Sequence, residues 1–158
     1  MKKQEKTNVM RLLDQQGVAY QSHCYEGTGA VSGAEVAAVL GQDPARVFKT
    51  LVTEGRSGQH YVFVIPVLQE LDLKKAAAAS GEKSIAMVKA KELLPLTGYI
   101  HGGCSPIGMK KPFPTFVEES AVLYDSILFS AGKIGYQVEL APDDLEKLVA
   151  FQYADLCE

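Results

Sequence analysis

A loop rich in glycine and proline, residues 99–112, contains the residue types in this chain that are best suited to chemistry. The adjacent Gly102 and Gly103 permit positive φ and leave backbone N–H groups uncovered by a side chain. Converging bare N–H groups can bind an anion or a developing oxyanion. Ser105 adds a hydroxyl, and Lys110-Lys111 add positive charge just downstream. A loop that recognises a phosphate or a carbonyl group has this composition, and so does an ordinary connection between two strands.

Lys49 is a second candidate, because it interrupts an apolar segment, residues 47–53, that predicts a β-strand. A lysine in such a strand must reach water, pair with a carboxylate or contact a ligand. Strand alternation would turn Lys49 toward solvent while Phe48 and Thr50 point inward. Alternatively, Lys49 supplies a point charge for a phosphate or carboxylate, and Thr50 donates a hydrogen bond beside it.

A second glycine-rich segment, Ser130-Ala131-Gly132-Lys133, lacks the flanking spacing of a phosphate-binding P-loop. Its composition is typical of a turn between two strands. As a functional element it would form the second wall of a pocket whose first wall is Gly102-Gly103. Tyr25, at the end of an expected strand, would then either line that pocket or pack in the core.

The sequence lacks the residues required for metal binding, for cofactor binding and for conventional general-base catalysis. A zinc site requires about four nitrogen or sulfur ligands at short spacings, and His101 and Cys104 have no such partners nearby in the sequence. The sequence contains no nucleophile elbow, zincin motif or dinucleotide fingerprint, so no metal and no cofactor is expected. The histidines are scattered and no carboxylates are evidently paired, which leaves no conventional general base.

The composition indicates one globular domain over residues 1–158. The net charge of −3 gives no global basic field, so DNA is not an expected partner, and any nucleic-acid contact must come from a local patch. No apolar run reaches membrane-spanning length, and the N-terminus lacks the apolar region of a signal peptide. The odd number of cysteines argues against a disulfide framework, and free thiols fit a cytoplasmic protein.

Periodicity and capping residues predict short helices and strands that alternate irregularly. Helices are expected over residues 9–16, 33–40, 73–80 and 90–94 and from residue 141 onward; strands are expected over residues 20–25, 47–53, 60–66, 84–87, 115–117, 127–130 and 136–140. Ser32 and Glu35 form a predicted capping box, Asp72 caps the third helix, and Pro95 is expected to end the fourth. The pattern predicts an α/β or α+β domain with a mixed sheet, wrapped by short helices.

Within this pattern, the segments 47–53 and 60–66 form the clearest hairpin. The second segment is a nearly continuous apolar run, and such a run is typical of a strand that is buried on both faces. The hairpin is therefore expected at the centre of the sheet.

Five motifs, in this order along the chain, together resemble the YbaK/EbsC family, the free-standing relatives of the editing domain inserted in bacterial prolyl-tRNA synthetases. The motifs are Tyr25-Glu26, the strand 47–51, Leu71-Asp72-Leu73-Lys74-Lys75-Ala76, the loop 102–108 with Lys110-Lys111, and Ser130-Ala131-Gly132-Lys133 followed by Val138-Glu139-Leu140. The resemblance covers nearly the whole chain. It implies a mixed α/β fold with a central barrel-like sheet, and the removal of a wrong amino acid from tRNA, most often cysteine or alanine from tRNA(Pro).

The resemblance also implies roles for individual residues. Lys49 matches a lysine expected to hold a phosphate of the tRNA 3′ end, and the backbone N–H of Gly102 would donate to the aminoacyl carbonyl. The remaining substrate-binding positions are Tyr25, Thr50, Gly103, Ser130 and Gln137. At two positions the chain departs from the family pattern: Gln137 stands where relatives often carry aspartate, and Ser32 stands where an aromatic residue is common.

The family mechanism would explain the missing general base. In cysteine-specific members the substrate's own thiol attacks its ester carbonyl, and the protein supplies orientation and electrostatics. The implied partners are the tRNA(Pro) acceptor end and a prolyl-tRNA synthetase. Three alternatives stay open: an Ala-tRNA(Pro) deacylase that positions a water, a binding module without turnover, and a general hydrolase of small esters.

Overall fold

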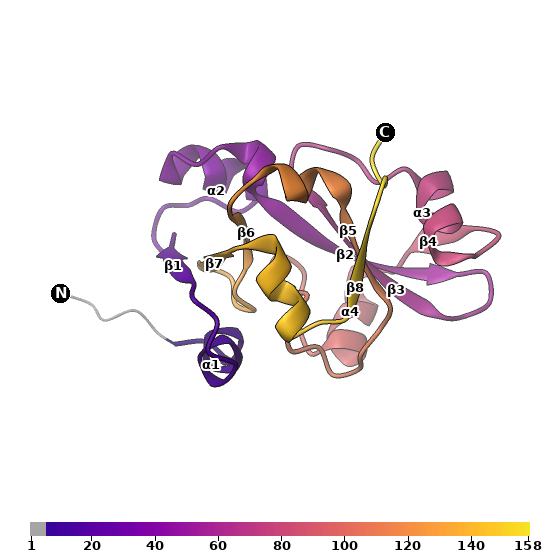
Figure 1. Ribbon diagram of the computed structural model, residues 1–158, viewed down its shortest axis with the longest axis horizontal. Helices are drawn as coiled ribbons and strands as arrows, with labels where there is room; N and C mark the ends of the chain where they lie inside the picture. Colours follow the sequence, from indigo (N-terminus) through magenta and orange to yellow (C-terminus); the bar gives the residue numbers. More distant parts are fainter. Residues whose placement is uncertain (1–5) are drawn as a thin grey trace.

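The computed structural model describes residues 6–158, which form a three-stranded sheet of order β1-β7-β6 and a five-stranded sheet of order β4-β2-β3-β5-β8 (Figure 1). The strands are β1 (Gln21–Cys24), β2 (Phe48–Gly55), β3 (His60–Pro66), β4 (Ile85–Met87), β5 (Thr115–Glu118), β6 (Ile127–Ser130), β7 (Tyr136–Leu140) and β8 (Phe151–Ala154). The helices are α1 (Asn8–Gln15), α2 (Gly33–Leu40), α3 (Leu73–Ser80) and α4 (Ala90–Thr97), with 3-10 helices η1 (Pro44–Arg46), η2 (Glu119–Leu123) and η3 (Pro142–Lys147).

Within the described residues, no helix is both long and apolar enough to cross a membrane. The N-terminal residues 1–5, where no signal peptide is expected, lie outside the described part.

The β2–β3 hairpin forms the centre of the five-stranded sheet. Its antiparallel register runs from Phe48 opposite Pro66 to Glu54 opposite His60. The strand β3 then pairs in parallel with β5, and β5 pairs in parallel with β8. Residues 61–66 of β3 are all buried, so the prediction that this apolar strand is covered on both faces is confirmed.

The two sheets meet where β2 begins. Val47, immediately before β2, forms a parallel bridge with Leu128 of β6. The mixed α/β class expected from the sequence is confirmed, and the strands form two joined sheets that do not close into a barrel within residues 6–158. The junction brings the first half of β2 next to the β6–β7 hairpin, which is the arrangement that creates the pocket described below.

Short-range signals set the starts of two helices as predicted. The Ser32 hydroxyl accepts from the Glu35 N–H and the Glu35 carboxylate accepts from the Ser32 N–H, which completes the capping box of α2. The Asp72 carboxylate accepts from the N–H groups of Lys74 and Lys75 at the start of α3. Both caps depend on residues close together in the chain, which is why the sequence reveals them.

Two predictions about helices are wrong. The helix expected to stop at Pro95 continues to Thr97, because Pro95 lies on the exposed side of α4, where water can satisfy the carbonyl that loses its hydrogen bond. The last helix is the short 3-10 helix η3, after which the chain forms β8, a strand not expected from the sequence. β8 forms because it pairs in parallel with β5. This pairing joins distant parts of the chain, so no local sequence pattern predicts it.

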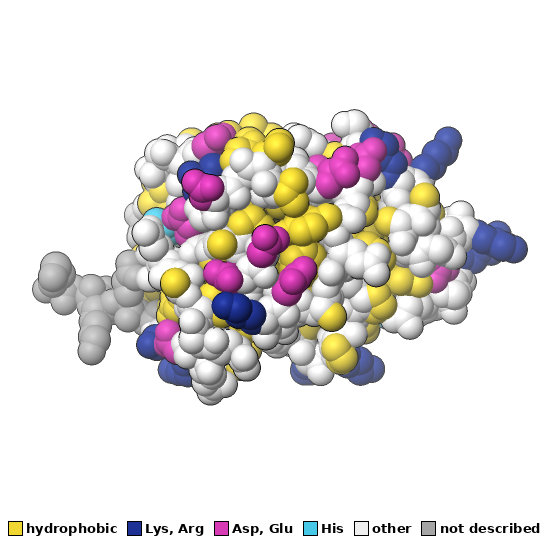
Figure 2. Space-filling model, viewed as in Figure 1, with side chains coloured by type: hydrophobic (Ala, Val, Ile, Leu, Met, Phe, Trp, Pro, Cys, Tyr) yellow, Lys and Arg dark blue, Asp and Glu magenta, His cyan; other side chains and the backbone are white. Residues whose placement is uncertain are grey.

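The C-terminal part of the chain is strongly acidic. Residues 118–158 contain nine acidic residues and two lysines. In the view that has η3 in front, magenta acidic side chains gather near the centre of the surface (Figure 2). The negative net charge of the protein is therefore unevenly distributed along the chain.

Candidate active site

A pocket of about 530 Å³ opens where the two sheets meet. Its walls come from β2, the β6–β7 hairpin, the start of α2, the segment from β4 into α4, and the first glycine-rich loop. Six of the seven predicted site residues line it: Tyr25, Lys49, Thr50, Gly102, Ser130 and Gln137. Its volume lies in the range that proteins use for small-molecule ligands.

Gly102 occupies the third position of a β-turn. The Gly103 N–H donates to the Ile100 carbonyl at 3.0 Å and closes the turn. Gly102 has a φ of +89°, and a positive φ at this position is characteristic of a type II turn and favours glycine. The Gly102 N–H takes no part in closing the turn, so it is left for another acceptor at the pocket wall, as an oxyanion donor requires.

Gly103, the seventh predicted residue, lies outside the pocket lining. Its N–H is used within the turn, and a Cβ at this position would lie 3.3 Å from the backbone nitrogen of Ile134 in the second glycine-rich loop. The absence of a side chain therefore lets the two loops pack closely. This packing brings Gly102 and Ile134 to the same pocket.

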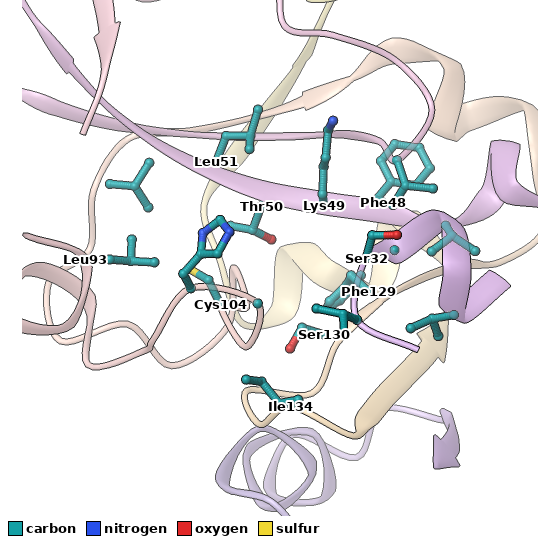
Figure 3. A pocket seen from close by; sticks show the side chains of 18 of the residues that line it. Ser32, Phe48, Lys49, Thr50, Leu51, Leu93, Cys104, Phe129, Ser130 and Ile134 are labelled. Carbon is teal, nitrogen blue, oxygen red and sulfur yellow. The ribbon is translucent and has the colours of Figure 1, made fainter. Parts of the chain in front are cut away.

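Thr50 points from β2 toward the side on which Cys104 and Ser130 lie (Figure 3). Its hydroxyl oxygen is buried and has no hydrogen-bond partner within the described residues. Leaving a buried hydroxyl unsatisfied costs about 1–3 kcal/mol. A hydrogen bond to a bound substrate would offset that cost, so Thr50 is a strong candidate for a substrate contact.

Lys49 also lines the pocket, but its side chain points to the opposite side of β2 from Thr50, together with Leu51 (Figure 3). The structure thus follows strand alternation. Lys49 forms no ion pair with any other described residue, so no carboxylate neutralises its charge.

Between the β6 bridge at Val47 and the β4 pairing that starts at residue 53, β2 has no paired strand on the side away from β3 within the described residues. The strand β4 pairs with residues 53–55 of β2, and the Val88 N–H donates to the Val52 carbonyl where that pairing ends. Alternate residues of an antiparallel strand direct their backbone groups to the same side, so Thr50 also directs its N–H and C=O away from β3. These two groups add a backbone donor and an acceptor to the pocket wall.

Ser130 and Gln137 lie opposite each other at the loop end of the β6–β7 hairpin. The Ser130 hydroxyl accepts from the Gly132 N–H at 3.1 Å, which fixes its oxygen and leaves its hydrogen to donate. Gln137 is 4% exposed, and its Oε1 accepts from Nε2 of Gln42 at 2.8 Å. This bond leaves the Gln137 Nε2 group as a neutral hydrogen-bond donor.

The apolar part of the lining was missed by the sequence reasoning. Val31, Met87 and Ile134 line the pocket and are exposed, while Leu93 of α4 is buried against it. Hydrophobic residues on short elements are ordinary in any sequence, so their types give no signal. These residues can be identified as part of the pocket only from the structure, in which several exposed apolar side chains surround one opening.

Two residues first considered for metal or thiol chemistry, His101 and Cys104, also line the pocket. Burial raises the pKa of the Cys104 thiol to about 12, so this thiol stays protonated near neutral pH and is a poor nucleophile. Within residues 6–158, no group of three or more His, Cys, Asp or Glu side chains is placed to hold a metal ion.

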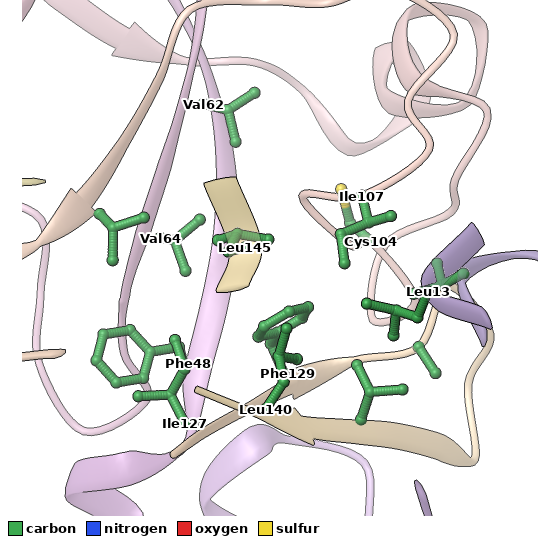
Figure 4. Close-up of a cluster of buried hydrophobic side chains, with 14 of the residues drawn as sticks. Leu13, Phe48, Val62, Val64, Cys104, Ile107, Ile127, Phe129, Leu140 and Leu145 are labelled. Atoms are coloured by element: carbon green, nitrogen blue, oxygen red, sulfur yellow. The ribbon is translucent and has the colours of Figure 1, made fainter. Parts of the chain in front are cut away.

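The inner wall of the pocket is the outer part of the main hydrophobic cluster. Phe48, Cys104 and Phe129 line the pocket and belong to this cluster. The cluster fills the space between the β2–β3 hairpin and the β6–β7 hairpin (Figure 4). Because protein interiors are close-packed, this wall holds the polar pocket residues at fixed positions.

A charged cluster stabilises the sheet junction two residues along β7 from Gln137. The Glu139 carboxylate accepts from His23 at 2.8 Å and from the Ser126 hydroxyl at 2.6 Å, and it pairs with Arg46 at 3.0 Å. Burial alone would raise the pKa of Glu139, but the Ser126 and His23 hydrogen bonds and the Arg46 charge outweigh burial and lower it. Arg46 directly precedes Val47 and β2, so the cluster fixes the start of β2 against β7.

The pocket therefore combines backbone and hydroxyl donors with a lysine at its edge. Glu35 is the one carboxylate of the lining, and its oxygens serve the α2 capping box. Such an arrangement suits catalysis by positioning and by stabilising negative charge. It suits catalysis by a carboxylate–imidazole pair poorly.

Comparison with known proteins agrees with this fold. The aminoacyl-tRNA editing domain family matches residues 28–148, a span that includes every residue of the predicted site except Tyr25. The chain belongs to this family, and the resemblance to the YbaK/EbsC family is confirmed.

A curated protein of Enterococcus faecalis, provisionally named the Cys-tRNA(Pro)/Cys-tRNA(Cys) deacylase EbsC, is 49% identical over 156 residues, which cover 98% of this chain and 95% of that protein. A crystal structure provisionally described as a trans-editing enzyme for prolyl-tRNA synthetase matches with a TM-score of 0.84 and 26% identity, over 95% of this chain and 94% of that chain. A solved hypothetical protein shares the fold with a TM-score of 0.84 at 24% identity, over 95% of this chain and 99% of that chain.

Proposed function

We propose that this protein is an aminoacyl-tRNA deacylase that removes cysteine from mischarged Cys-tRNA(Pro), with Cys-tRNA(Cys) as a second substrate. The observation that carries the proposal is the convergence of six residues, from five places along the chain, on one pocket. The 49% identity to the deacylase-named relative supports the substrate assignment. The domain is proposed to span residues 1–158.

In the proposed complex, the aminoacyl group enters the pocket and the terminal phosphate stays at its edge. Lys49, whose side chain leaves β2 on the side opposite Thr50 and has no ion-pair partner among the described residues, contacts this phosphate outside the pocket. Thr50 and Ser130 donate hydrogen bonds from two sides, and Gln137 closes the far wall with its amide. Tyr25 packs against the bound group as a pocket wall.

The proposed reaction uses the thiol of the substrate. The cysteine sulfur attacks the ester carbonyl carbon, a C–S bond forms, and the C–O bond to the ribose breaks. The thiol proton passes to the ribose oxygen, and cysteine leaves as a cyclic thioester that water hydrolyses. The Gly102 N–H donates to the carbonyl oxygen as negative charge develops on it, an interaction whose loss typically costs about 10²–10³-fold in rate.

The proposed partner is the acceptor end of tRNA(Pro), alone or presented by a prolyl-tRNA synthetase in the cytoplasm. No protein base is needed, because the nucleophile belongs to the substrate. The site therefore has to select and orient the aminoacyl group, and its walls are built from donors and apolar side chains that suit this task.

The test is single-turnover deacylation of Cys-tRNA(Pro) and Ala-tRNA(Pro) at equal concentration. Lys49→Ala should lower the rate on Cys-tRNA(Pro) by about 10- to 100-fold, the range of one charge-assisted contact. Lys74→Ala, which removes an exposed lysine of α3 outside the pocket, is the matched control and should leave the rate unchanged. Thermal unfolding of each variant verifies that the fold is intact.

Other outcomes point to the alternatives. A Lys49→Ala protein as fast as the wild type would overturn the assigned role of Lys49. Release of alanine but not cysteine by the wild type would replace the substrate assignment. Binding of a cysteinyl-adenylate analogue without release from either tRNA would indicate a binding module, and equal activity on a small cysteine ester would indicate a general hydrolase.

A further inference from the structure

Four lysines on or next to α4, which we call the basic face, give this segment a local positive charge on a protein whose net charge is negative. They are Lys89, Lys91, Lys110 and Lys111, and all four are exposed. Residues 83–117 contain five lysines and a single acidic residue, Glu92, in contrast to the acidic segment 118–158. The charge of the chain is thus divided between a basic segment that includes part of the pocket wall and an acidic segment at the C-terminal end.

The basic face follows α4. Lys89 is the N-cap residue of this helix, and Lys91 lies in its first turn. Lys110 lies at the other end, because its N–H donates to the Thr97 carbonyl at 3.0 Å and its Cγ would be 3.4 Å from a Cβ built at Gly98. Eight helical residues span about 12 Å, so the positive charges are spaced along the length of the helix.

Among the described residues, these lysines have no ion-pair partner. None of the four forms an ion pair with another described residue, whereas Lys75 pairs with Asp155 and Lys147 pairs with Asp144. The one nearby carboxylate, Glu92, accepts from the backbone N–H of Lys89 and is part of the helix start. Exposed, unpaired like charges repel one another, and a polyanion that covers them gains by releasing its counterions.

The basic face is continuous with the candidate active site. Lys89, Ala90 and Leu93 of this segment line the pocket, and so do His101 and Gly102 of the loop that follows. A polyanion lying along α4 would therefore pass the pocket opening. The acidic segment 118–158 would repel the same polyanion where its carboxylates are exposed.

We infer that Lys91, Lys110 and Lys111, together with Lys89 at the pocket edge, bind the backbone phosphates of the tRNA acceptor arm. This inference rests on the proposed function, since it places the body of the same substrate outside the pocket. Phosphate contacts position a nucleic acid without reading its sequence. The face would therefore supply affinity and orientation for the tRNA, while the pocket selects the amino acid.

The test compares two triple variants that lower the net charge equally. Lys91→Gln/Lys110→Gln/Lys111→Gln removes the part of the basic face that lies outside the pocket lining. Arg56→Gln/Lys74→Gln/Lys147→Gln removes three exposed cations elsewhere. Half-saturating concentration and maximal rate are measured in single-turnover deacylation of Cys-tRNA(Pro) and of cysteinyl-adenosine, which has no phosphate, between 50 and 200 mM salt.

The basic-face variant should need on the order of 10-fold more Cys-tRNA(Pro) for half-saturation at 50 mM salt, with an unchanged maximal rate. Its plot of log affinity against log salt should be less steep by about 2, since each lost phosphate contact removes about 0.7–0.9 from the slope. Cysteinyl-adenosine should be cleaved as by the wild type. Equal losses in the two triple variants, or an unchanged slope in the basic-face variant, would overturn the inference.

Failure of the proposed function would be recognised separately. If the wild type cleaved neither substrate, the deacylase assignment would fall, and binding of uncharged tRNA(Pro), followed by fluorescence anisotropy over the same salt range, would decide the inference. A weaker, less salt-dependent complex of the basic-face variant would support it. No salt-dependent binding by the wild type, or equal binding by both triple variants, would refute it.

Discussion

Two polar regions lie near each other on the same sheet junction and differ in how their groups are satisfied. In the Glu139 cluster, the carboxylate has three partners, His23, Arg46 and Ser126, at 2.6–3.0 Å. In the pocket, the Thr50 hydroxyl is buried without a partner among the described residues, and the turn around Gly102 closes without using its N–H. Both regions involve the start of β2 and the strand β7.

The difference separates groups that stabilise the fold from groups available to a ligand. A buried polar group that has internal partners contributes to stability, and its loss leaves those partners unsatisfied. A group without partners costs stability in the free protein and gains its hydrogen bond when substrate binds. Removal of a pocket group should therefore cost activity, whereas removal of a cluster group should cost stability.

Among the substitutions that test this comparison, Gly102→Ala is expected to have the largest effect, which is on the deacylation rate. The φ of +89° is unfavourable for alanine, so the turn should shift and the N–H should leave its position, with about a 100-fold loss of deacylation rate. The matched control is Gly41→Ala at the C-cap of α2. Gly41 has a φ of +67°, and a Cβ added there would meet no other atom within 4 Å.

Both glycine variants should lose stability by about 1–2 kcal/mol, measured by urea unfolding, but only Gly102→Ala should lose activity. If Gly41→Ala lost activity to the same degree, general strain would explain the result and Gly102 would have no special part.

A smaller and sharper contrast is available within β2. Thr50 and Thr53 are both threonines of this strand, but the Thr53 hydroxyl donates to the Tyr61 carbonyl at 3.0 Å and the Thr50 hydroxyl has no partner in the described structure. Thr50→Val should lower the deacylation rate by about 10-fold, the value of one hydrogen bond near 1.4 kcal/mol, without loss of stability.

Thr53→Val should do the reverse, with a free energy of unfolding lower by about 1 kcal/mol and an unchanged rate. The comparison would fail if Thr50→Val destabilised the protein as much as Thr53→Val, because Thr50 would then have an internal role.

The smallest expected effect is the pH dependence of the Glu139 cluster. The folded-state pKa of Glu139 lies below its ordinary value, so its contribution to stability is present above about pH 4.3 and is lost as the pH falls through the folded-state pKa. Glu139→Gln should lower the free energy of unfolding by about 1 kcal/mol at pH 7, with a difference from the wild type that shrinks below pH 4.

Urea unfolding between pH 3 and 7 measures this dependence, with Glu119→Gln, an exposed carboxylate of η2, as the control. A constant difference between Glu139→Gln and the wild type across that range would mean that the cluster does not hold the carboxylate in its charged form.

The parts of the fold that depend on neighbours in sequence were predicted well. The capping box of α2 and the β2–β3 hairpin follow from residues a few positions apart. The continuation of α4 through Pro95 was not predicted, because it depends on whether water reaches the far side of the helix. The strand β8 was missed because its partner β5 lies more than thirty residues earlier in the chain.

The sequence by itself determined which residue types were present for chemistry: the glycine pair, the strand lysine, the second glycine loop and the absence of a conventional base. The tertiary structure decided which of them meet. It separated Gly102, whose N–H is left free by its turn, from Gly103, whose N–H closes that turn. It also turned Lys49 and Thr50 to opposite sides of β2 and set the Gln42 amide against Gln137. These outcomes depend on long-range packing and on which backbone and side-chain groups are already hydrogen-bonded. Neither can be predicted from the local sequence.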